Sequence, residues 1–245
     1  PTARWFKDKL GVPTKVQKDT WPAIASGHPV LVSAPTGTGK TLSAFLVFID
    51  RLYAMAQEGT LKEELYLIYV SPLKSLAGDI RENLNRPLDG IRHEMERLEG
   101  AVHMAGSARP PQTARAAESA RPPQTACPAE SVCLDIQVGI RTGDTPQKDR
   151  QRMVKHPPHI LIITPESLYL MLTSMTGQKV LRTARAVIID ELHALIDTKR
   201  GAHLMLSIAR LDRLCERPLQ RIGLSATIEP LELAAAYLSP EPAVI

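Results

Sequence analysis

Aromatic residues and cysteines are scarce in this 245-residue chain, in which aromatics make up 4% and there are three cysteines. Cys127, Cys133 and Cys215 form no C-x-x-C pair and cannot all pair with one another, which predicts a reducing compartment and no zinc site. No apolar run approaches the roughly 18 to 20 residues that cross a bilayer. The opening residues, "PTARWFKDK", are not those of a signal sequence. We therefore expect a cytoplasmic protein with no membrane partner.

A strong charge of either sign is also absent. The formal net charge is +4 and the isoelectric point is near 9.0, which permits a nucleic-acid partner without requiring one. The hydrophobic fraction of 44% and the charged fraction of 23% are ordinary for a soluble protein. Composition therefore leaves the function to be decided by the motifs.

Short apolar runs that alternate with longer segments of helical period predict an α/β fold with a mainly parallel sheet and helices on both faces. The expected strands span residues 29–34, 65–71, 135–140, 159–164, 186–190 and 221–225. The expected helices begin near Lys40, Leu73, Pro146, Pro165, Gly201 and Pro230. Proline suits such starts, because the first helical turn offers no partner for the N–H that proline lacks.

One stretch breaks this alternation. The run "SARPPQTARAAE" from Ser107 is followed by "SARPPQTACPAE" from Ser119, which makes a tandem repeat. The segment is rich in proline and lacks aromatic residues, so it buries too little apolar surface to offset its ordering entropy. Residues 105–132 are therefore expected to form a disordered surface insertion, a duplicated loop with no function of its own.

The stretch "SAPTGTGKT", Ser33 to Thr41, lies between an apolar strand and a helix, as a phosphate-binding loop does. The glycines let the backbone wrap around a β-phosphate, the lysine adds a positive charge near the β- and γ-phosphates, and the last hydroxyl suits Mg²⁺. Ala34 stands where the first glycine of the pattern G-x-x-x-x-G-K-[ST] falls, and the alternative is a glycine-rich turn before a helix. The nucleotide is expected at Pro35, Thr36, Gly37, Thr38, Gly39, Lys40 and Thr41.

Hydrolysis needs carboxylates, and "VIIDELH" supplies two. Asp190 ends an apolar run, as a carboxylate that holds Mg²⁺ through water does, and Glu191 follows where it can face the water that attacks the γ-phosphate. Taken alone, an acidic pair after a strand also fits a solvated loop or a helix cap. Downstream of a phosphate loop, the pair predicts ATP hydrolysis with Lys40, Asp190 and Glu191 as catalytic residues and Thr41 and Asp190 as Mg²⁺ ligands.

The order of the motifs "APTGTGKT", "SPLKSLA", "RTGDT", "TPESL", "DELH" and "SAT" resembles the first RecA-like domain of a superfamily 2 helicase of the DExH group. Three longer segments have sequences similar to those of the large helicase-related (Lhr) family: "YVSPLKSLAGDIRENL", "VGIRTGDTPQKDRQRM" and "PPHILIITPESLYLML". The resemblance covers nearly the whole chain except the repeat. It implies a RecA-like P-loop NTPase fold, one helicase ATP-binding domain over residues 1–245, and ATP and Mg²⁺ as cofactors.

Further roles follow from this resemblance alone. "PTKVQ" is similar to the element in which an amide, here Gln17, reads adenine, and "SAT" to the element that couples the nucleotide site to nucleic-acid movement. The implied coupling residues are His193, Ser225, Ala226 and Thr227. The implied nucleic-acid contacts are Ser71, Pro72, Leu73, Lys74, Arg141, Thr142, Gly143, Asp144, Thr164, Pro165 and Glu166. Small hydroxyls, N–H groups and helix N-termini suit a phosphate backbone, although each residue taken alone also fits a loop or cap.

Two neighbouring features have open interpretations. Lys199 and Arg200 of "DTKRGAHL" fit a nucleic-acid backbone, a second domain or a solvated basic turn. The aromatic residues Trp5, Phe6 and Trp21 flank the adenine element, and we expect them to pack in the core rather than stack on the base.

A superfamily 2 motor closes two RecA-like domains around ATP, but no second set of strands and no Q-x-x-G-R-x-x-R-like run occurs before Ile245. We therefore expect the second domain to be missing and turnover by this chain to be slow. The resemblance implies movement along single-stranded DNA in preference to RNA, 3′ to 5′, in DNA repair or nucleic-acid remodelling. The alternative is a nucleotide-dependent nucleic-acid-binding scaffold without turnover. A kinase or GTPase is disfavoured, since no N-K-x-D motif or acceptor pocket is evident.

Overall fold

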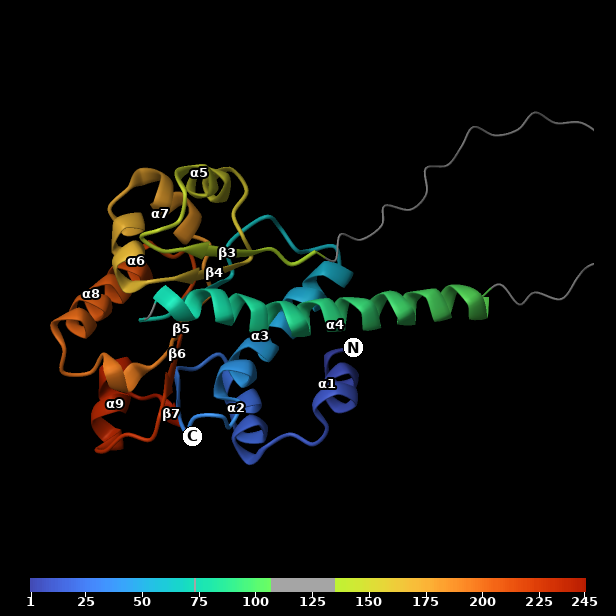
Figure 1. Cartoon of the computed structure of the whole chain (residues 1–245), viewed down its shortest axis with the longest axis horizontal. Helices are drawn as coiled ribbons and strands as arrows, with labels where there is room; N and C mark the ends of the chain where they lie inside the picture. The colour runs from blue at the N-terminus through green and yellow to red at the C-terminus, as the bar shows by residue number, and fades with distance from the viewer. Residues whose placement is uncertain (73, 107–134) are drawn as a thin grey trace, which may run out of the picture.

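The computed structural model describes residues 1–72, 74–106 and 135–245 (Figure 1). Seven strands in these residues form one sheet, and every pair of neighbouring strands is parallel. Their order across the sheet is β3-β4-β2-β5-β6-β1-β7. The strands are β1 (Val30–Ser33), β2 (Leu67–Val70), β3 (Val138–Arg141), β4 (Ile160–Ile163), β5 (Ala186–Ile189), β6 (Gln220–Ser225) and β7 (Ala243–Val244).

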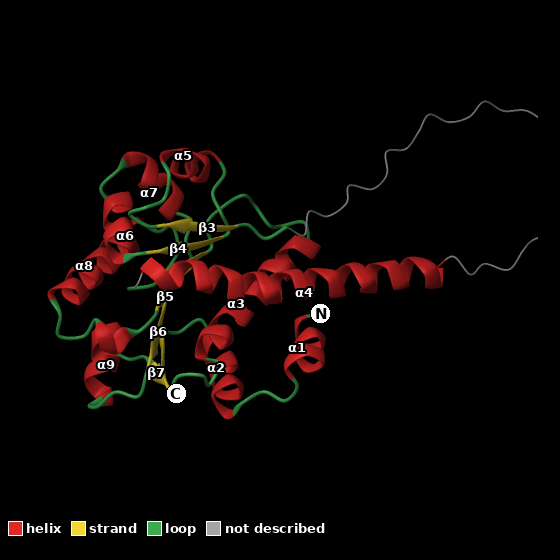
Figure 2. Ribbon diagram, viewed as in Figure 1, coloured by secondary structure: helices red, strands yellow, loops and turns green. Residues whose placement is uncertain are grey.

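Helices cover both faces of this sheet, which Figure 2 shows edge-on between two groups of helices. One face is covered by α1 (Thr2–Leu10), α2 (Lys15–Ala25), α3 (Lys40–Gln57) and α4 (Lys74–Gly106). The other face is covered by α6 (Pro165–Leu172), α7 (Met175–Leu181), α8 (Lys199–Leu214) and α9 (Leu231–Leu238). The helix α5 (Gln147–Lys155) lies between β3 and β4 in sequence, and the short 3₁₀ helix η1 (Leu192–Ala194) follows β5.

The strand β2 illustrates why the sequence forms a central strand. All four of its side chains are buried. Successive side chains of a strand point to opposite faces, and here Leu67 and Tyr69 join the core beneath α1–α4, whereas Ile68 and Val70 join the core beneath α6–α9. An uninterrupted apolar run is therefore required, because neither face of this strand meets solvent.

The predicted fold class is confirmed, and all six predicted strands are present. The strand β3 is displaced from its predicted range, since it begins at Val138 and ends at Arg141. The predicted helices begin within two residues of the expected positions. Of the three prolines at these starts, Pro165 lies in the first helical turn, whereas Pro146 and Pro230 precede their helices as N-caps. The sequence interpretation missed α1, α2, α7 and β7.

The aromatic residues near the N-terminus pack in the core, as predicted. Trp5 and Phe6 of α1 are buried, and the ring of Trp21 meets that of Phe6 edge-on at 5.2 Å between centroids. The predicted insertion lies outside the described residues from position 107 onward, whereas its expected first two residues, Ala105 and Gly106, belong to α4. No helix of the described part of the chain is long and apolar enough to cross a membrane.

Candidate nucleotide and nucleic-acid site

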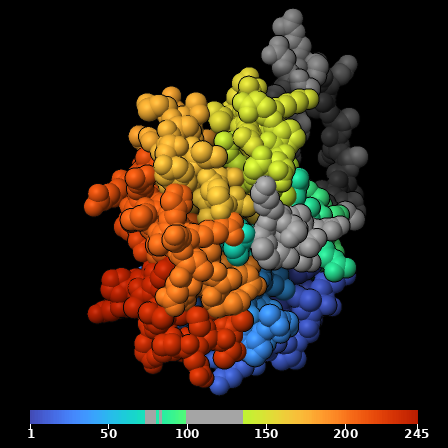
Figure 3. All heavy atoms as spheres, turned by 60° about the vertical axis from the view of Figure 1, so that its left-hand side comes forward, coloured from blue at the N-terminus to red at the C-terminus, as the bar shows by residue number. Residues whose placement is uncertain are grey.

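Six of the predicted motifs gather at one edge of the sheet, because each of these six follows the carboxyl end of a parallel strand. The strand order divides this edge into two adjacent halves. The phosphate loop, "DELH" and "SAT" follow the neighbouring strands β1, β5 and β6, and "RTGDT", "TPESL" and "SPLKSLA" follow the neighbouring strands β3, β4 and β2. In Figure 3, the surfaces of β3–α5 (yellow-green) and α6–α8 (orange) adjoin on one face. Motifs far apart in sequence thus meet as two connected groups.

The phosphate loop turns at two glycines with left-handed backbone, Gly37 at φ 81° and Gly39 at φ 84°. Gly39 is the N-cap of α3, so the loop ends at a helix N-terminus, where free N–H groups and the helix dipole favour an anion. Ala34, which replaces the first glycine of the pattern, is buried and donates its N–H to the carbonyl of Ser225 at 3.2 Å. The backbone of Ala34 does not have a positive φ, so the loop tolerates a side chain at this position.

The ammonium of Lys40 lies across the mouth of this loop. Its Nζ donates to the carbonyl oxygens of Ala34 at 2.5 Å and Pro35 at 2.9 Å. Burial lowers the pKa of Lys40, and the neighbouring carboxylates Glu191 and Asp190 oppose that shift. Their influence shows that the lysine and the acidic pair share one electrostatic environment although they come from different strands.

Asp190 lies at the end of β5 with 8% of its surface exposed. Its N–H donates to the carbonyl of Val70, and its Oδ2 accepts a hydrogen bond from the buried hydroxyl of Tyr69. Burial raises the pKa of Asp190, whereas the hydrogen bond from Tyr69 lowers it. Burial also raises the pKa of Tyr69 well above its ordinary value, and the neighbouring side chain of Thr41 opposes that rise. The two predicted Mg²⁺ ligands thus lie beside one phenol, which is hydrogen-bonded to Asp190.

Glu191 has left-handed backbone, with φ 50° and ψ 44°, and it caps η1. This turn directs its carboxylate toward His193, whose Nε2 lies 3.2 Å from Oε2 of Glu191. The Nδ1 of His193 accepts the backbone N–H of Ala226 at 3.1 Å and lies 3.4 Å from the hydroxyl of Ser225. Because Nδ1 accepts, the proton of the neutral ring is on Nε2 and is donated to Glu191. The structure therefore brings "DELH" and "SAT" into direct contact, while Thr227 is exposed.

Gln17 lies beside the phosphate loop but serves first as a helix cap. Its Oε1 accepts the N–H of Thr14 at 2.9 Å, and the Thr14 hydroxyl accepts the N–H of Gln17, which is a capping box for α2. The Thr14 hydroxyl also donates to the carbonyl of Thr38. A methyl group built on Gly39 would lie 2.7 Å from Nε2 of Gln17. The adenine candidate is thus fixed against the loop.

The motif after β2 is largely buried. Ser71 and Pro72 are buried, and the N–H of Ser71 donates to the carbonyl of Ile163 at 3.0 Å. Leu73 and the side chain of Lys74 lie outside the described residues. The described residues of this motif therefore link the end of β2 to that of β4. They present backbone atoms, more than side chains, at this edge of the sheet.

The loop "RTGDT" is held by a residue that the sequence interpretation missed, Arg150 of α5. Its Nε donates to the carbonyl of Thr145 at 2.8 Å, and its Nη2 donates to the carbonyl of Gly143 at 2.7 Å and to that of Thr142 at 3.4 Å. Arg141 is half-buried at the end of β3, and burial together with the charge of Arg150 lowers its pKa. Gly143 and Asp144 are exposed at the tip. The loop thus presents two nearby guanidinium groups.

The motif "TPESL" begins α6. The hydroxyl of Thr164 accepts the N–H of Ser167, and Thr164 and Pro165 are buried, so their side chains shape the helix start. Glu166 is exposed and makes a bidentate ion pair with Arg200, with N···O distances of 2.6 and 3.1 Å. The hydrogen bonds from Arg200 lower the pKa of Glu166. Arg200, one of the two cations whose role was open, is therefore engaged within the chain.

A phosphate loop after β1 and an acidic pair after β5, two parallel strands separated by β6 in a sheet covered by helices, define a RecA-like P-loop nucleotide-binding domain. The sequence model of the DEAD/DEAH box helicase family matches residues 14–123 and 124–234. The chain therefore belongs to the DEAD/DEAH box helicase family.

Several known proteins resemble the chain over nearly its full length. The Lhr helicase/probable uracil glycosylase of Mycolicibacterium smegmatis is 46% identical over 238 residues, which are 97% of this chain and 14% of that protein. The ATP-dependent helicase Lhr-Core of Methanothermobacter thermautotrophicus is 42% identical over 96% of this chain and 24% of that protein. The structure of Mycobacterium smegmatis helicase Lhr bound to ssDNA and AMP-PNP superposes with a TM-score of 0.78 at 43% identity, covering 100% of this chain and 27% of that one. The chain thus spans at most about a quarter of these proteins.

Proposed function

We propose that the chain is the ATP-binding motor domain of a nucleic-acid helicase or translocase, which couples ATP hydrolysis to movement along single-stranded nucleic acid, DNA in preference to RNA. The observation that carries this proposal is the hydrogen-bonded link from Glu191 through His193 to Ala226. A residue that meets the attacking water is thereby joined to the loop after β6. A change at the γ-phosphate can therefore move the loop after β6. A scaffold that only binds nucleotide does not need such a link.

In this proposal, the loop from Pro35 to Thr41 holds the phosphates, with Lys40 exchanging its bonds to loop carbonyls for bonds to phosphate oxygens. Gln17 is assigned to adenine, since its amide keeps one acceptor lone pair and its donor group beside Gly39. The half of the edge formed by the loops after β3, β4 and β2 is assigned to the phosphate backbone of the strand. The ssDNA and AMP-PNP named for the similar Lhr structure support both assignments.

Magnesium fits the residues present. No three His, Cys, Asp or Glu side chains come together as a metal cage in the described residues, and Mg²⁺ does not need one, because it is held by one or two carboxylates, waters and substrate phosphates. Thr41 would ligate the ion directly and Asp190 through water. The ion, when bound, would neutralise charge that develops on the phosphates. Tyr69 fixes the Asp190 carboxylate, and Glu191 orients the attacking water and accepts its proton.

The partner of this domain is proposed to be a second RecA-like domain that supplies an arginine to the γ-phosphate. Such an arginine is worth about 10³ to 10⁵ in rate, so turnover by this chain alone is expected to be slow. The probable uracil glycosylase in the name of the Mycolicibacterium smegmatis relative supports a role in DNA repair or nucleic-acid remodelling, and the proposed location is the cytoplasm.

The test is ATP turnover by this chain with and without single-stranded DNA, beside Lys40→Ala and the surface control Lys9→Ala. Slow turnover that Lys40→Ala abolishes and Lys9→Ala leaves unchanged supports the motor domain. Turnover equal in the chain and in Lys40→Ala would refute the assignment of the phosphate loop. Fast, DNA-stimulated turnover would instead show that the arginine comes from this chain or from a second copy.

A further inference from the structure

A cavity of about 310 Å³ lies at the edge of the sheet opposite the motifs. Its walls come from Met55 of α3 and from three loops that enter the amino ends of neighbouring strands: the loop before β2, the loop before β5 and the loop before β6. In a parallel sheet, the amino and carboxyl ends of the strands lie on opposite edges, so this cavity is separate from the nucleotide site. None of the residues assigned to ATP or nucleic acid lines it.

The charges in this cavity are unbalanced and unpaired. Four cationic residues line it, Lys62, Arg182, Arg185 and Arg217, against the two carboxylates Glu64 and Glu216. Within the described residues, none of these six side chains makes an ion pair within 4.0 Å. Apart from Nη1 of Arg185, which lies 4.0 Å from Sδ of Met55, the cations therefore keep hydrogen-bond donors free although acidic residues lie in the same walls.

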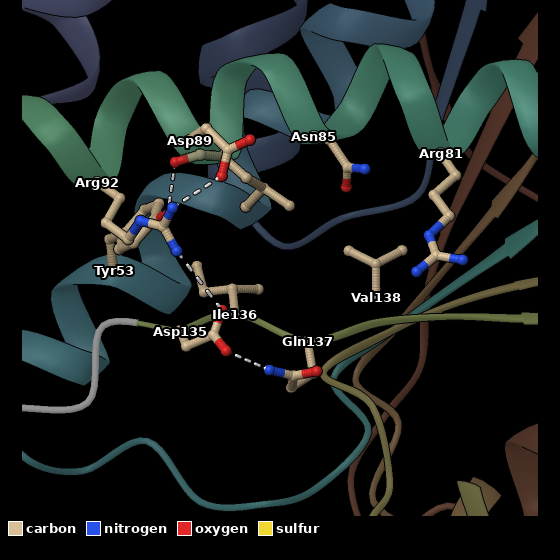
Figure 4. Close-up of a pocket in the computed structure, with 10 residues that line it drawn as sticks. Tyr53, Arg81, Asn85, Asp89, Arg92, Asp135, Ile136, Gln137 and Val138 are labelled. Carbon is tan, nitrogen blue, oxygen red and sulfur yellow. Dashed lines mark hydrogen bonds and ion pairs between the residues drawn. The ribbon is translucent and has the colours of Figure 1, made fainter.

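The cavity between α4 and β3, of about 280 Å³, provides a contrast (Figure 4). There, Arg92 already meets Asp89 at 3.1 Å and Asp135 at 3.9 Å, and Gln137 donates to Asp135. Of the two guanidinium groups that line that cavity, Arg81 and Arg92, that of Arg92 is thus neutralised by its own neighbours. The basic residues at the amino edge of the sheet are not.

The walls of the cavity at the amino edge are also fixed in place. The guanidinium of Arg185 is half-buried and lies 4.5 Å above the centre of the Tyr66 ring, a cation–π contact that holds its plane. The Tyr66 hydroxyl accepts the N–H of Lys62 at 3.1 Å, and the Thr183 hydroxyl bonds to both the N–H and the carbonyl of Leu65 at 3.1 Å. A ligand that enters would find donors already ordered, which lowers the cost of binding.

We propose that this cavity binds a phosphate group, either as a free anion or as part of a nucleic acid. Guanidinium groups present planar pairs of N–H donors that match phosphate oxygens. The volume lies at the lower end of the range for small-ligand pockets, about 300 to 1,000 Å³. The carboxylates Glu64 and Glu216 limit the negative charge that the walls accept, so the site takes one phosphate group and not a tract of them.

The experiment follows backbone amide resonances of this chain by NMR during titration with inorganic phosphate, and separately with a 5′-phosphorylated single-stranded oligonucleotide. Thr183 reports on the cavity and Gly39 reports on the phosphate loop, so binding at the two sites is read separately. The test variant is Arg182→Gln/Arg217→Gln, in which both replaced side chains are exposed. The matched control is Lys7→Gln/Lys9→Gln, which removes the same charge from exposed positions of α1.

The expected result is a saturable shift at Thr183 whose dissociation constant rises about tenfold or more in the test variant and stays unchanged in the control. A shift with inorganic phosphate identifies a free anion as sufficient, and a shift with the oligonucleotide alone identifies a phosphate carried by nucleic acid. No shift at Thr183 with either probe, or an equal shift in the test variant, would overturn the proposal. Because Gly39 is read independently, failure here would leave the proposed nucleotide site untouched.

Discussion

The hydroxyl of Tyr69 in β2 donates a hydrogen bond to Oδ2 of Asp190 at the end of β5. The Tyr69 ring is fully buried and stacks on Phe45 of α3, with 4.8 Å between ring centroids and 24° between planes. The parallel register, in which Tyr69 faces Ile188, brings the phenol level with the aspartate two residues later. A rigid side chain beneath the site therefore fixes which oxygen of Asp190 is free.

Tyr69→Phe is expected to shift the acid limb of the pH dependence of kcat/KM for ATP toward higher pH. Burial raises the pKa of Asp190 and the Tyr69 hydroxyl lowers it, so removing the hydroxyl raises the pKa further. Asp190 acts as a carboxylate, and activity is therefore present above this pKa and lost as the pH falls through it. The measurement is a pH profile of kcat/KM at saturating Mg²⁺.

Tyr53→Phe is the matched control for this change. The Tyr53 hydroxyl is also buried and donates to the carbonyl of Leu88 at 2.7 Å, far from the acidic pair in the fold. Its loss should lower the free energy of unfolding by about 1 to 3 kcal/mol without moving the pH profile. An unshifted profile in Tyr69→Phe would show that the phenol supports packing alone.

The nucleotide half of the site was predictable because its chemistry is local in sequence. Turning glycines, a lysine and a hydroxyl stand within one loop, and apolar runs before that loop and before Asp190 predict the strands. Tyr69 was missed because its role depends on strand order, which joins residues 121 positions apart. The sequence contained one indication of this role, because Tyr69 places a hydroxyl within a strand, β2, whose other residues are aliphatic and buried.

Other elements were missed for different physical reasons. The run "TKVQ" carries the capping box of α2, a Thr followed three residues later by Gln, so the sequence did contain a helix start. In contrast, β7 has two exposed residues at an edge of the sheet beside β1, so it is too short for an alternating or buried pattern to mark it. Arg150 reads as one of many cations on a polar helix, and only the fold brings it to the "RTGDT" loop.

Gly39→Ala should weaken ATP binding and lower stability more than Gly59→Ala does. Both glycines have left-handed backbone, at φ 84° and φ 65°, so alanine costs about 1 to 2 kcal/mol at either site. At Gly39 the new methyl group would also press on Nε2 of Gln17 at 2.7 Å, whereas nothing lies within 4 Å at Gly59. Denaturant unfolding and calorimetric ATP titration measure the two effects. Equal losses in both variants would mean that Gln17 moves aside freely.

Glu191→Gln should preserve ATP binding and reduce single-turnover hydrolysis by about 10² to 10⁴. Glutamine has the same shape and can still meet His193, but it cannot accept a proton from water. The surface control is Glu58→Gln at the end of α3, which removes the same charge. Hydrolysis that survives in Glu191→Gln would exclude this carboxylate as the base.

When this domain is joined to the second RecA-like domain proposed above, His193→Ala should slow turnover and remove its dependence on DNA. The change leaves the N–H of Ala226 without its partner and breaks the link to Glu191. The loss of hydrogen bonds worth about 1 to 3 kcal/mol corresponds to about a 5- to 150-fold slower reaction. Turnover is compared with and without DNA in the two-domain protein, in its His193→Ala variant and in its His28→Ala variant, whose ring is exposed and remote from these loops in the fold. Retained DNA dependence in His193→Ala would place the coupling elsewhere.

Arg150→Gln should weaken binding of single-stranded DNA about tenfold or more while leaving ATP binding unchanged. Two of the carbonyls that Arg150 holds, those of Thr145 and Gly143, lie within 2.8 Å of its guanidinium, and hydrogen bonds from charged groups contribute about 1.5 to 3 kcal/mol each. Without them the loop loses its defined shape. The measurement is fluorescence anisotropy of a labelled oligonucleotide at fixed salt.

Arg152→Gln separates this loop-ordering effect from the loss of charge. Arg152 lies on the same helix, is exposed and donates no side-chain hydrogen bond within the described residues. Each variant removes one positive charge, so the contribution of counterion release to DNA affinity is comparable in the two variants. That contribution becomes smaller as the salt concentration is raised. The difference between the variants should therefore persist at high salt, because it comes from the ordered carbonyls and not from the charge. If the two variants bind DNA equally, Arg150 acts as one more surface cation and the ordered loop is not what the strand recognises.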